Sequence, residues 1–401
     1  FWLKLKQPGG QAMSRERSRS RSRESSSSSS LPAVPGEMSA GLSAEEVAEA
    51  ISKCAPTFET VGWGKAVPDG KGKWHLLQGL WSGLGFVGQV SFKEQGGGER
   101  HIIVKSMKAH DGPYEDAAEE FEKKRDFASY SAEAAFYKGG YAAQLCEAGA
   151  MCPLPLRVER LDRSIVLYMT RLPGRESRPM SQGQSKAALR WLARLHATHW
   201  GEARADEAVR QGLQPQGTFW HLDTRQKELA RMSTSGDDGR LKAAAGAIDK
   251  RLKADPMQTV VHGDPKDANI MVDAQDGEVA LFDFQWIGKA CAAKDLAYCL
   301  STATSRLSED DEDDYIEHYH TELTRLLELQ GDTPPSLAYL TMMYSIAMAD
   351  LYRWMAGWGR WGQVRRLQAH VKGVLKRLDG GKLLGDKAYE EAIFKQFPFP
   401  G

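Results

Sequence analysis

Residues 260–272 read VVHGDPKDANIMV, and residues 281–286 read LFDFQW. His262, Asp264 and Asn269 follow one β-branched run, and Asp283 lies inside the next apolar run. Short apolar runs bounded by turn-forming residues predict buried strands, which would place these polar side chains on loops at the strand ends. Asp264 and Asn269 share one loop, and Asp283 follows on the next strand turn, so the three can converge. A lone HGD is a weak signal, so its meaning depends on the rest of the chain.

Composition describes a globular chain of 401 residues, 41% hydrophobic and 26% charged, enough for one large or two modest domains. Residues 1–37 carry a charge of +4 and the remainder −4, which excludes a basic nucleic-acid footprint from the folded body. The five cysteines are scattered and form no CxxC pair, which favours reduced, packed thiols and a cytoplasmic location. The apolar residues 337–358 are interrupted by Asp350 and Arg353, which favours a buried helix over a membrane span.

The segment 13–30, MSRERSRSRSRESSSSSS, has almost no apolar residue and predicts disorder, so residues 1–37 are interpreted as a tail. An arginine-serine segment can be phosphorylated, contact RNA or recruit protein partners, but a solvated tail is the preferred interpretation. Ser43 and Glu46 have capping-box spacing, which predicts that the first helix follows Leu42.

Gly83, Gly85 and Gly88 form a GxGxxG, a pattern that occurs in both dinucleotide-binding folds and kinases. Residues 89–93 then alternate polar and apolar side chains, and three glycines at 96–98 break the chain. This pattern predicts a hairpin instead of the helix that a dinucleotide-binding unit requires. A glycine-rich turn between antiparallel strands lets backbone amides approach phosphate oxygens.

Two charged residues follow on separate predicted elements. Lys105 ends the apolar strand HIIVK, and Glu133 lies among aromatic residues on a helix predicted over 127–145. Each could be an ordinary surface residue, but together they could form an ion pair. Further on, residues 154–174 predict two strands around a turn at 161–163, and residues 185–201 predict an amphipathic helix. On that helix packing is favoured over metal binding for His196 and His199, and the last 120 residues predict helices almost throughout.

Taken in order, these segments resemble the aminoglycoside phosphotransferase and choline kinase superfamily, most closely its ecdysteroid-kinase-like (CHK kinase-like) branch. The matching segments are SGLGFVGQV with HIIVK, YSAEAAFY, LYMTRLPG, LARLHATHW, HGDPKDANIM, FDFQW and DLAYCL, which together cover roughly residues 75–300. The resemblance implies an α+β, two-lobed protein-kinase-like fold. A small antiparallel β-sheet N-lobe over 38–172 would precede a mainly helical C-lobe over 173–401, which holds the catalytic loop and the acceptor pocket.

The resemblance also implies roles for individual residues. Asp264 corresponds to the catalytic aspartate, and Lys266 could touch the transferring phosphate or be a surface residue. Asn269 and Asp283 correspond to ligands of Mg²⁺, an ion that suits amide and carboxylate oxygens. The expected ATP-binding residues are Gly83, Gly85, Gly88, Lys105, Glu133 and, at the hinge MTRL, Met169, Thr170 and Leu172.

Several features separate the possible functions. Only eleven residues lie between Asp283 and Asp295, too few for a peptide-docking segment, so the expected acceptor is a small molecule with a hydroxyl group. Three departures from the family pattern remove no required charge: the MTRL hinge, Pro265 and Gln285. An active kinase is therefore favoured over the alternative, a nucleotide-binding pseudokinase or scaffold that recruits partners through its arginine-serine tail.

Two further features concern the acceptor side. Asp295 is expected to cap a helix and pack. An aromatic cluster could line an acceptor pocket, although core packing is favoured for at least two of its members; these are Tyr352, Trp354, Trp358 and Trp361. The acidic run 308–315 could attract a cationic acceptor, but such runs are usually solvated loops or helix starts.

Overall fold

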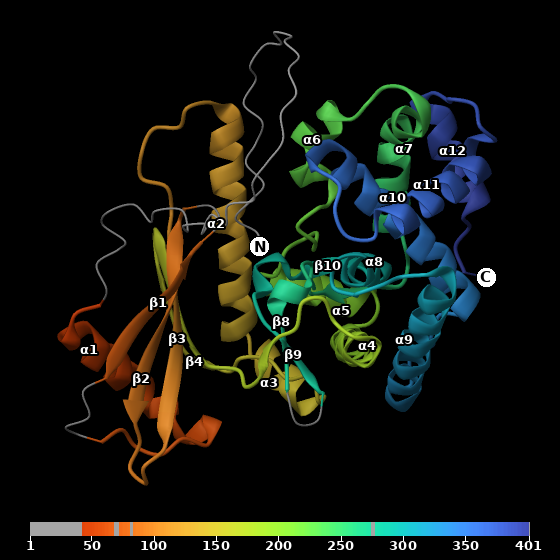
Figure 1. The fold of residues 1–401 in the computed structure, drawn as a ribbon. Coiled ribbons are helices and arrows are strands. Elements are labelled where there is room, and N and C mark those ends of the chain that lie inside the picture. The colour runs from red at the N-terminus through yellow and green to blue at the C-terminus, as the bar shows by residue number, and fades with distance from the viewer. Residues whose placement is uncertain (1–41, 68–71, 81–82, 274–276, 401) are drawn as a thin grey trace, which may run out of the picture.

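The computed structural model describes residues 42–67, 72–80, 83–273 and 277–400. An antiparallel sheet dominates the N-terminal part and helices dominate the C-terminal part, so the predicted α+β class is confirmed (Figure 1). The arginine-serine tail over 1–37 lies outside the described residues, and its predicted disorder stays a prediction.

The sheet has five strands, and each neighbouring pair is antiparallel. In spatial order the strands are β1 (Lys73–Gly79), β2 (Gly85–Lys93), β3 (Glu99–Lys108), β5 (Ser164–Thr170) and β4 (Pro155–Leu161). The predicted hairpin is present, since β1 and β2 are antiparallel neighbours on either side of the glycine-rich turn, and the break at the three glycines separates β2 from β3. Residues 155–170 form the predicted strand pair.

The first described helix, α1 (Ala44–Cys54), begins where the sequence predicts. The Ser43 side chain accepts the backbone N–H of Glu46, and the Glu46 carboxylate accepts the backbone N–H of Ser43 at 2.7 Å. The apolar face of α1, with Val47 and Ile51, packs in one cluster with residues of the sheet. The capped helix thus covers one side of the sheet.

Helix α2 (Ala117–Lys138) stands between the sheet and the C-terminal helices (Figure 1). Its last three turns are buried and carry Tyr130, Glu133 and Phe136. The short α3 (Tyr141–Glu147) follows and leads back to β4. Because α2 touches both parts of the molecule, Glu133 is positioned at their junction.

The C-terminal part has one large apolar core. Its helices are α4 (Gln182–Thr198), α5 (Glu202–Arg210), α6 (Gln226–Arg231), α7 (Gly236–Lys253), α8 (Ala293–Thr302), α9 (Glu309–Gln330), α10 (Leu337–Trp358), α11 (Val364–Asp379) and α12 (Asp386–Gln396). The buried α10 matches the apolar stretch predicted as a core helix, and no helix of the described ranges is long and apolar enough to cross a membrane. The five cysteines are free thiols, and four of them are buried.

Short strands support the loops that carry the motif residues. β7 (Gln258–Val261) pairs with β10 (Gly288–Cys291), while β8 (Ile270–Val272) lies between β6 (Arg175–Glu176) and β9 (Val279–Leu281). The loop at 262–269 joins β7 to β8, and the loop at 282–287 joins β9 to β10. Two neighbouring small sheets therefore present both loops toward α2.

Candidate active site

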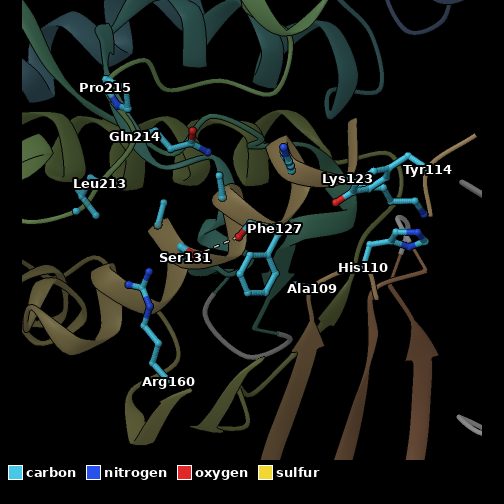
Figure 2. Close-up of a pocket in the computed structure, with 14 residues that line it drawn as sticks. Ala109, His110, Tyr114, Lys123, Phe127, Ser131, Arg160, Leu213, Gln214 and Pro215 are labelled. Atoms are coloured by element: carbon cyan, nitrogen blue, oxygen red, sulfur yellow. Dashed lines mark hydrogen bonds between the residues drawn. The ribbon is translucent and has the colours of Figure 1, made fainter. Parts of the chain in front are cut away.

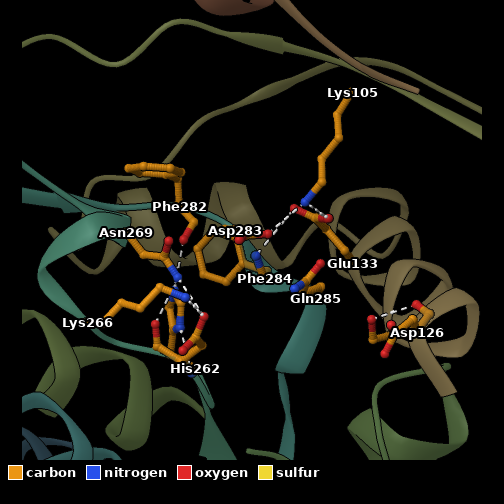
Figure 3. A network of polar contacts seen from close by, with 12 residues as sticks. Lys105, Asp126, Glu133, His262, Lys266, Asn269, Phe282, Asp283, Phe284 and Gln285 are labelled. Carbon is orange, nitrogen blue, oxygen red and sulfur yellow. Dashed lines mark hydrogen bonds and ion pairs between the residues drawn. The ribbon is translucent and has the colours of Figure 1, made fainter. Parts of the chain in front are cut away.

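A buried lysine connects three parts of the fold (Figure 3). The Lys105 Nζ atom on β3 lies 2.6 Å from Glu133 Oε2 on α2 and 2.6 Å from Asp283 Oδ1. The Glu133 carboxylate also accepts the backbone N–H of Phe284 at 3.3 Å. The three side chains thus tie the sheet, α2 and the loop after β9 together.

The electrostatics of this triad follow from burial and mutual pairing. Burial raises the pKa of Glu133, and Lys105 only partly offsets the effect. Burial also acts on Asp283, but the adjacent Lys105 ammonium outweighs it and lowers the pKa of that carboxyl. For Lys105 itself, burial would lower the pKa, but Asp283 and Glu133 overcome this and raise it. Lys105 and Asp283 are therefore both charged at neutral pH.

Asp283 adopts an unusual backbone conformation. Its φ of 69° lies in the left-handed region, where aspartate is tolerated better than most residues. This conformation turns the chain sharply between β9 and the 3₁₀ turn Phe284–Trp286. The Phe284 ring then stacks on Phe136 of α2 at 4.0 Å and lies 5.0 Å from the ring of His262. The aromatic contact explains why an apolar residue follows Asp283.

The loop after β7 is closed by its own side chains. Asn269 donates from Nδ2 to the Asp264 carbonyl at 2.9 Å and to Asp264 Oδ2 at 3.0 Å. Lys266 also pairs with Asp264 Oδ2. Burial raises the pKa of Asp264 above its usual range, and the Lys266 ammonium opposes that rise. Asp264 is only 2% exposed, so its carboxylate depends on these neighbours for compensation.

His262 fixes the loop without carrying charge. Its Nε2 lies 3.1 Å from the Phe282 carbonyl oxygen, which can only accept, so this nitrogen donates. Its Nδ1 accepts the backbone N–H of Asp264 at 3.3 Å. Burial lowers the pKa of His262, in keeping with the neutral tautomer that these two bonds require. His262 thereby links the two loops and orients Asp264.

Asp295 holds the same loop from below, and the prediction that it caps a helix is wrong. The helix α8 begins after Ala292, whose side chain makes no capping bond, and Asp295 lies inside the first turn. Its carboxylate accepts the backbone N–H groups of His262 at 2.7 Å and Gly263 at 2.9 Å. His196 Nε2 lies 3.2 Å from the same carboxylate. The sequence has no local signal for these contacts, because the partners are more than 30 residues away.

The predicted metal ligands lie on adjacent loops. The backbone N–H of Phe282, next to Asp283, donates to the carbonyl of Asn269 at 3.1 Å. No cluster of three His, Cys, Asp or Glu side chains occurs in the described ranges, so a cation here would need ligands from elsewhere. One carboxylate, one amide and the phosphates of a nucleotide are the donor set that suits Mg²⁺. Asn269 and Asp283 could therefore hold this ion together with a nucleotide.

The three glycines Gly83, Gly85 and Gly88 are required for different structural reasons. A Cβ at Gly85 would lie 1.9 Å from the Ser106 carbonyl oxygen, and one at Gly88 would lie 1.9 Å from the Trp74 ring. Gly83 has a φ of 68°, which a side chain would strain. Close packing and turn geometry thus account for all three glycines. The register also places Gly85 and Gly88 on the strand next to β3, which carries Lys105, while Gly83 lies in the turn before that strand.

The hinge residues end β5, two strands from the glycine-rich turn. Met169 and Leu172 are buried, and Thr170 exchanges hydrogen bonds of 2.9 Å with the backbone of Leu154. Because β5 pairs with β3, Met169 lies opposite Ile103, two residues before Lys105. These residues are thus placed along one edge of the candidate site.

Two other predicted features are resolved by the structure. Tyr352 and Trp354 are buried in the helical core, and the acidic run begins α9, where Ser308 is the N-cap. A cleft with a volume of about 560 Å³ lies between α2 and residues 212–215, and Lys123, Phe127 and Ser131 are among its lining residues (Figure 2). Neither Lys105 nor Asp264 lines this cleft.

Comparison with known proteins gives one family. Residues 89–329 match the phosphotransferase enzyme family (APH). No curated protein shows significant similarity to the chain. The match begins within β2, after Gly83, Gly85 and Gly88, covers β3, the hinge and both loops of the site, and extends almost to the end of α9.

Solved structures are similar at low identity. The amicoumacin kinase hAmiN, in complex with AMP-PNP, Ca²⁺ and Ami, is 12% identical with a TM-score of 0.45, over 89% of this chain and 98% of that one. An ethanolamine kinase of Plasmodium vivax is 13% identical with a TM-score of 0.41, over 76% and 82%. A choline kinase of Streptococcus pneumoniae is 15% identical with a TM-score of 0.40, over 75% and 92%. By its sequence match, the chain belongs to the phosphotransferase enzyme family.

Proposed function

We propose that this protein is a small-molecule kinase that transfers the γ-phosphate of ATP to a hydroxyl group, with Mg²⁺ as cofactor. The observation that carries the proposal is the meeting of Lys105, Asp283 and Asp264 where the sheet, α2 and the two loops converge. Phosphoryl transfer needs charge placed around the phosphates more than covalent chemistry, and these residues supply that charge.

In this proposal Lys105, held by Glu133, binds the nucleotide phosphates beneath the turn formed by Gly83, Gly85 and Gly88. The hinge residues Met169, Thr170 and Leu172 line the adenine side. Residues 38–172 then act as the nucleotide lobe, and residues 173–401 act as the lobe for catalysis and the acceptor. The ion pair of 2.6 Å between Lys105 and Glu133 supports this assignment, because it fixes the ammonium in place.

Asn269 and Asp283 are the proposed Mg²⁺ ligands. A bound Mg²⁺ would neutralise charge on the phosphates. The lowered pKa of Asp283 supports this role, because the carboxylate is ionised at neutral pH and can exchange its contact with Lys105 for a metal.

Asp264 is the proposed base. It accepts the proton of the acceptor hydroxyl while the hydroxyl oxygen bonds to the γ-phosphorus and the bond to the ADP oxygen breaks. Burial raises the pKa of Asp264, which makes the carboxylate a stronger base than an exposed aspartate. Lys266 is the proposed contact to the transferred phosphate, and its pairing with Asp264 supports this role.

A nucleotide-binding measurement tests the metal and phosphate assignments. The purified chain should bind ATP with Mg²⁺ present, and the affinity should fall when a chelator is added. Asp283→Ala should abolish turnover, because it removes the one carboxylate among the two proposed Mg²⁺ ligands. ATP binding that ignores the chelator, or no ATP binding, would contradict the site.

A turnover assay separates the kinase from a scaffold that only binds nucleotide. We place the enzyme in the CHK kinase-like branch on the order of its motifs, with a hydroxylated small molecule as acceptor. Screening hydroxylated metabolites for ATP-dependent phosphorylation tests both points. A chain that binds ATP but transfers phosphate to neither acceptor nor water would be a scaffold.

A further inference from the structure

Unpartnered polar atoms gather on the helical side of Asp264. In the part of the chain that the structure describes, four buried donors near this loop have no hydrogen-bond partner: Thr218 Oγ1, Arg225 Nη2, Trp286 Nε1 and Trp354 Nε1. Most buried polar groups in proteins are paired, so a group of them beside a reactive carboxylate points to a ligand. All four can donate a hydrogen bond, which indicates a ligand that accepts.

The chain before α6 carries Arg225 to the catalytic loop. The backbone N–H of Phe219 donates to the Gly263 carbonyl at 3.1 Å, directly before Asp264. Arg225 then donates from Nε to the Phe219 carbonyl at 3.0 Å, and its guanidinium lies 3.8 Å from the centre of the Phe219 ring. Arg225 is therefore fixed to the same backbone that positions Asp264.

Tyr298 approaches Asp264 from α8. It lies one turn after Asp295, the residue that holds the loop backbone. Burial, the charge of the Asp264 carboxylate and a hydrogen bond to it all raise the pKa of the Tyr298 phenol, so Tyr298 is held against the proposed base. The Trp354 ring lies 6.2 Å from the Tyr298 ring and 5.6 Å from the Arg225 guanidinium. Tyr298 and Arg225 thus flank one indole next to the proposed base.

We propose that Arg225 and Tyr298 bind the acceptor and select one that carries a carboxylate besides its reactive hydroxyl. The inference rests on the kinase function proposed above. The unpartnered Nη2 of Arg225 would donate to the acceptor carboxylate, and the Tyr298 phenol would hydrogen-bond the acceptor near Asp264. The flat faces of Phe219 and Trp354 favour an acceptor with an apolar or aromatic body.

The charges around Arg225 favour an acid over an amine. The nearest carboxylate to Arg225 is that of Glu228, at 3.7 Å from Nη1. Asp126 pairs with Arg125 at 2.8 Å, and Asp264 pairs with Lys266. A cationic acceptor would meet Arg225 without a spare carboxylate to receive it, whereas an acidic acceptor completes the pairing.

Arg225 also stays charged despite its burial. Burial and the nearby Arg125 lower the pKa of Arg225 to about 10, which leaves the guanidinium protonated at neutral pH. Arg225 and Asp264 are each only 2% exposed.

The test is a phosphorylation screen with matched acceptors. Sets of a hydroxylated acid, its amide and its amine are incubated with ATP and Mg²⁺, and phosphorylated products are detected by mass spectrometry. One such set is 4-(hydroxymethyl)benzoate, 4-(hydroxymethyl)benzamide and 4-(hydroxymethyl)benzylamine. We expect acids to be phosphorylated with kcat/KM at least about 10² above their amides, as for sites built around a polar group of the substrate.

Variants of Arg225 show whether this residue recognises the carboxylate of the acceptor. Arg225→Met should reduce the preference for acid over amide by about 10²-fold, because a charged partner is lost. Arg225→Lys keeps the charge but not the planar fork, so a smaller loss of about tenfold, mainly in KM, is expected. Because the measure is a ratio of two substrates, a partly unfolded variant that loses both equally does not imitate it.

Arg251→Met is the matched control. Arg251 is equally buried and also stacks on an aromatic ring, with 4.5 Å to the centre of Phe399, but it binds the C-terminal carbonyls of Phe397 and Pro398. Its replacement should lower Tm and leave the ratio of acid to amide unchanged. A ratio that falls equally in Arg251→Met would show that loss of packing, not of Arg225, sets the preference.

Other outcomes overturn the inference separately from the kinase function. If only amines or amides are phosphorylated, the carboxylate acceptor is refuted but the kinase function stands. The same holds if the protein hydrolyses ATP and no acid in the screen is phosphorylated. A preference for acids that survives Arg225→Met refutes the role of Arg225. Failure to bind or hydrolyse ATP removes the kinase function itself, and the inference with it.

Discussion

The nucleotide half and the acceptor half of the candidate site are held in opposite ways. On the nucleotide half, Lys105 has two carboxylate partners at 2.6 Å each, and all three side chains belong to one ion network. On the acceptor half, Asp264 pairs with Lys266 and Arg225 lies 3.7 Å from Glu228, but the buried Nη2 of Arg225 has no hydrogen-bond partner among the described residues. Both halves contain ion pairs, but the acceptor half also keeps a buried donor without a partner.

This difference indicates which half needs a bound ligand to complete its hydrogen bonds. In the nucleotide half, Asp283 can exchange Lys105 for a metal, so binding replaces contacts that already exist. In the acceptor half, a ligand adds contacts that the protein does not supply itself, and each buried unpaired group costs about 1–3 kcal/mol. We therefore expect nucleotide binding to tolerate changes in the acceptor half, and transfer to depend on both halves.

The largest expected effect separates the halves at Asp264. Asp264→Asn keeps size and polarity but removes the charge that accepts a proton, so transfer should fall by roughly 10² to 10⁴. ATP affinity should persist, because the nucleotide half keeps Lys105 and Asp283. The measurement is the Kd for ATP by calorimetry beside transfer to an acceptor, with slow ATP hydrolysis as a surrogate.

Asp283→Asn is the contrasting variant. It changes the metal ligand and removes a partner of Lys105, so both ATP affinity and transfer should fall. If Asp264→Asn transferred phosphate like the parent, the assignment of the base would be wrong. If both variants lost ATP affinity equally, the division of the site into two halves would fail.

The next effect concerns the stability of the nucleotide half. Lys105→Met leaves Glu133 and Asp283 facing each other without a cation, and breaking a buried pair in this way costs about 3–5 kcal/mol. Chemical denaturation should show this loss in the free energy of unfolding. Lys108→Met is the control: its side chain is 72% exposed, so the change should stay within about 0.5 kcal/mol. Equal effects of the two would contradict the triad.

The sequence predicted the nucleotide half better than the acceptor half for a physical reason. Alternating strands, glycine-rich turns and the placement of Lys105 depend on local patterns, and the structure has the hairpins and the Lys105–Glu133 contact. The predicted fold class came from the family resemblance of the ordered segments. Local rules suffice where neighbouring residues form the element.

The remaining contacts depend on segments that no local rule connects. The sequence predicts Asp295 as a helix cap, but its carboxylate accepts the backbone N–H groups of His262 and Gly263, more than 30 residues away. The contact of Asp283 with Lys105 spans 178 residues. Arg225 lies in a stretch without any motif, and it became visible only through burial. Such contacts require the three-dimensional path of the chain.

A smaller effect probes the charge balance at Asp264. Lys266 lowers the pKa of this carboxyl, so Lys266→Met should raise it. The base is active when deprotonated, so the acid limb of the profile of kcat/KM against pH should move to higher pH. The pH profile across the acid range measures this shift. An acid limb that stays in place, or moves to lower pH, would show that Lys266 does not act on the base.

The smallest effect is expected from removing residues 1–37. This deletion tests whether the nucleotide half and the acceptor half are sufficient for catalysis. The segment 13–30 offers almost no apolar side chain for docking, and α1 brings its own capping box at Ser43, so the folded part has a start that does not need the tail. The kinetic constants for ATP and for the acceptor should agree with the full chain within about twofold, as expected for a terminal segment that is not tied down. A loss in the ATP constant alone would assign the tail to the nucleotide half, because α1 covers the same sheet that carries Lys105. A loss in the kinetic constant for the acceptor alone would assign the tail to the acceptor half. Either result would mean that the tail is a third part of the site.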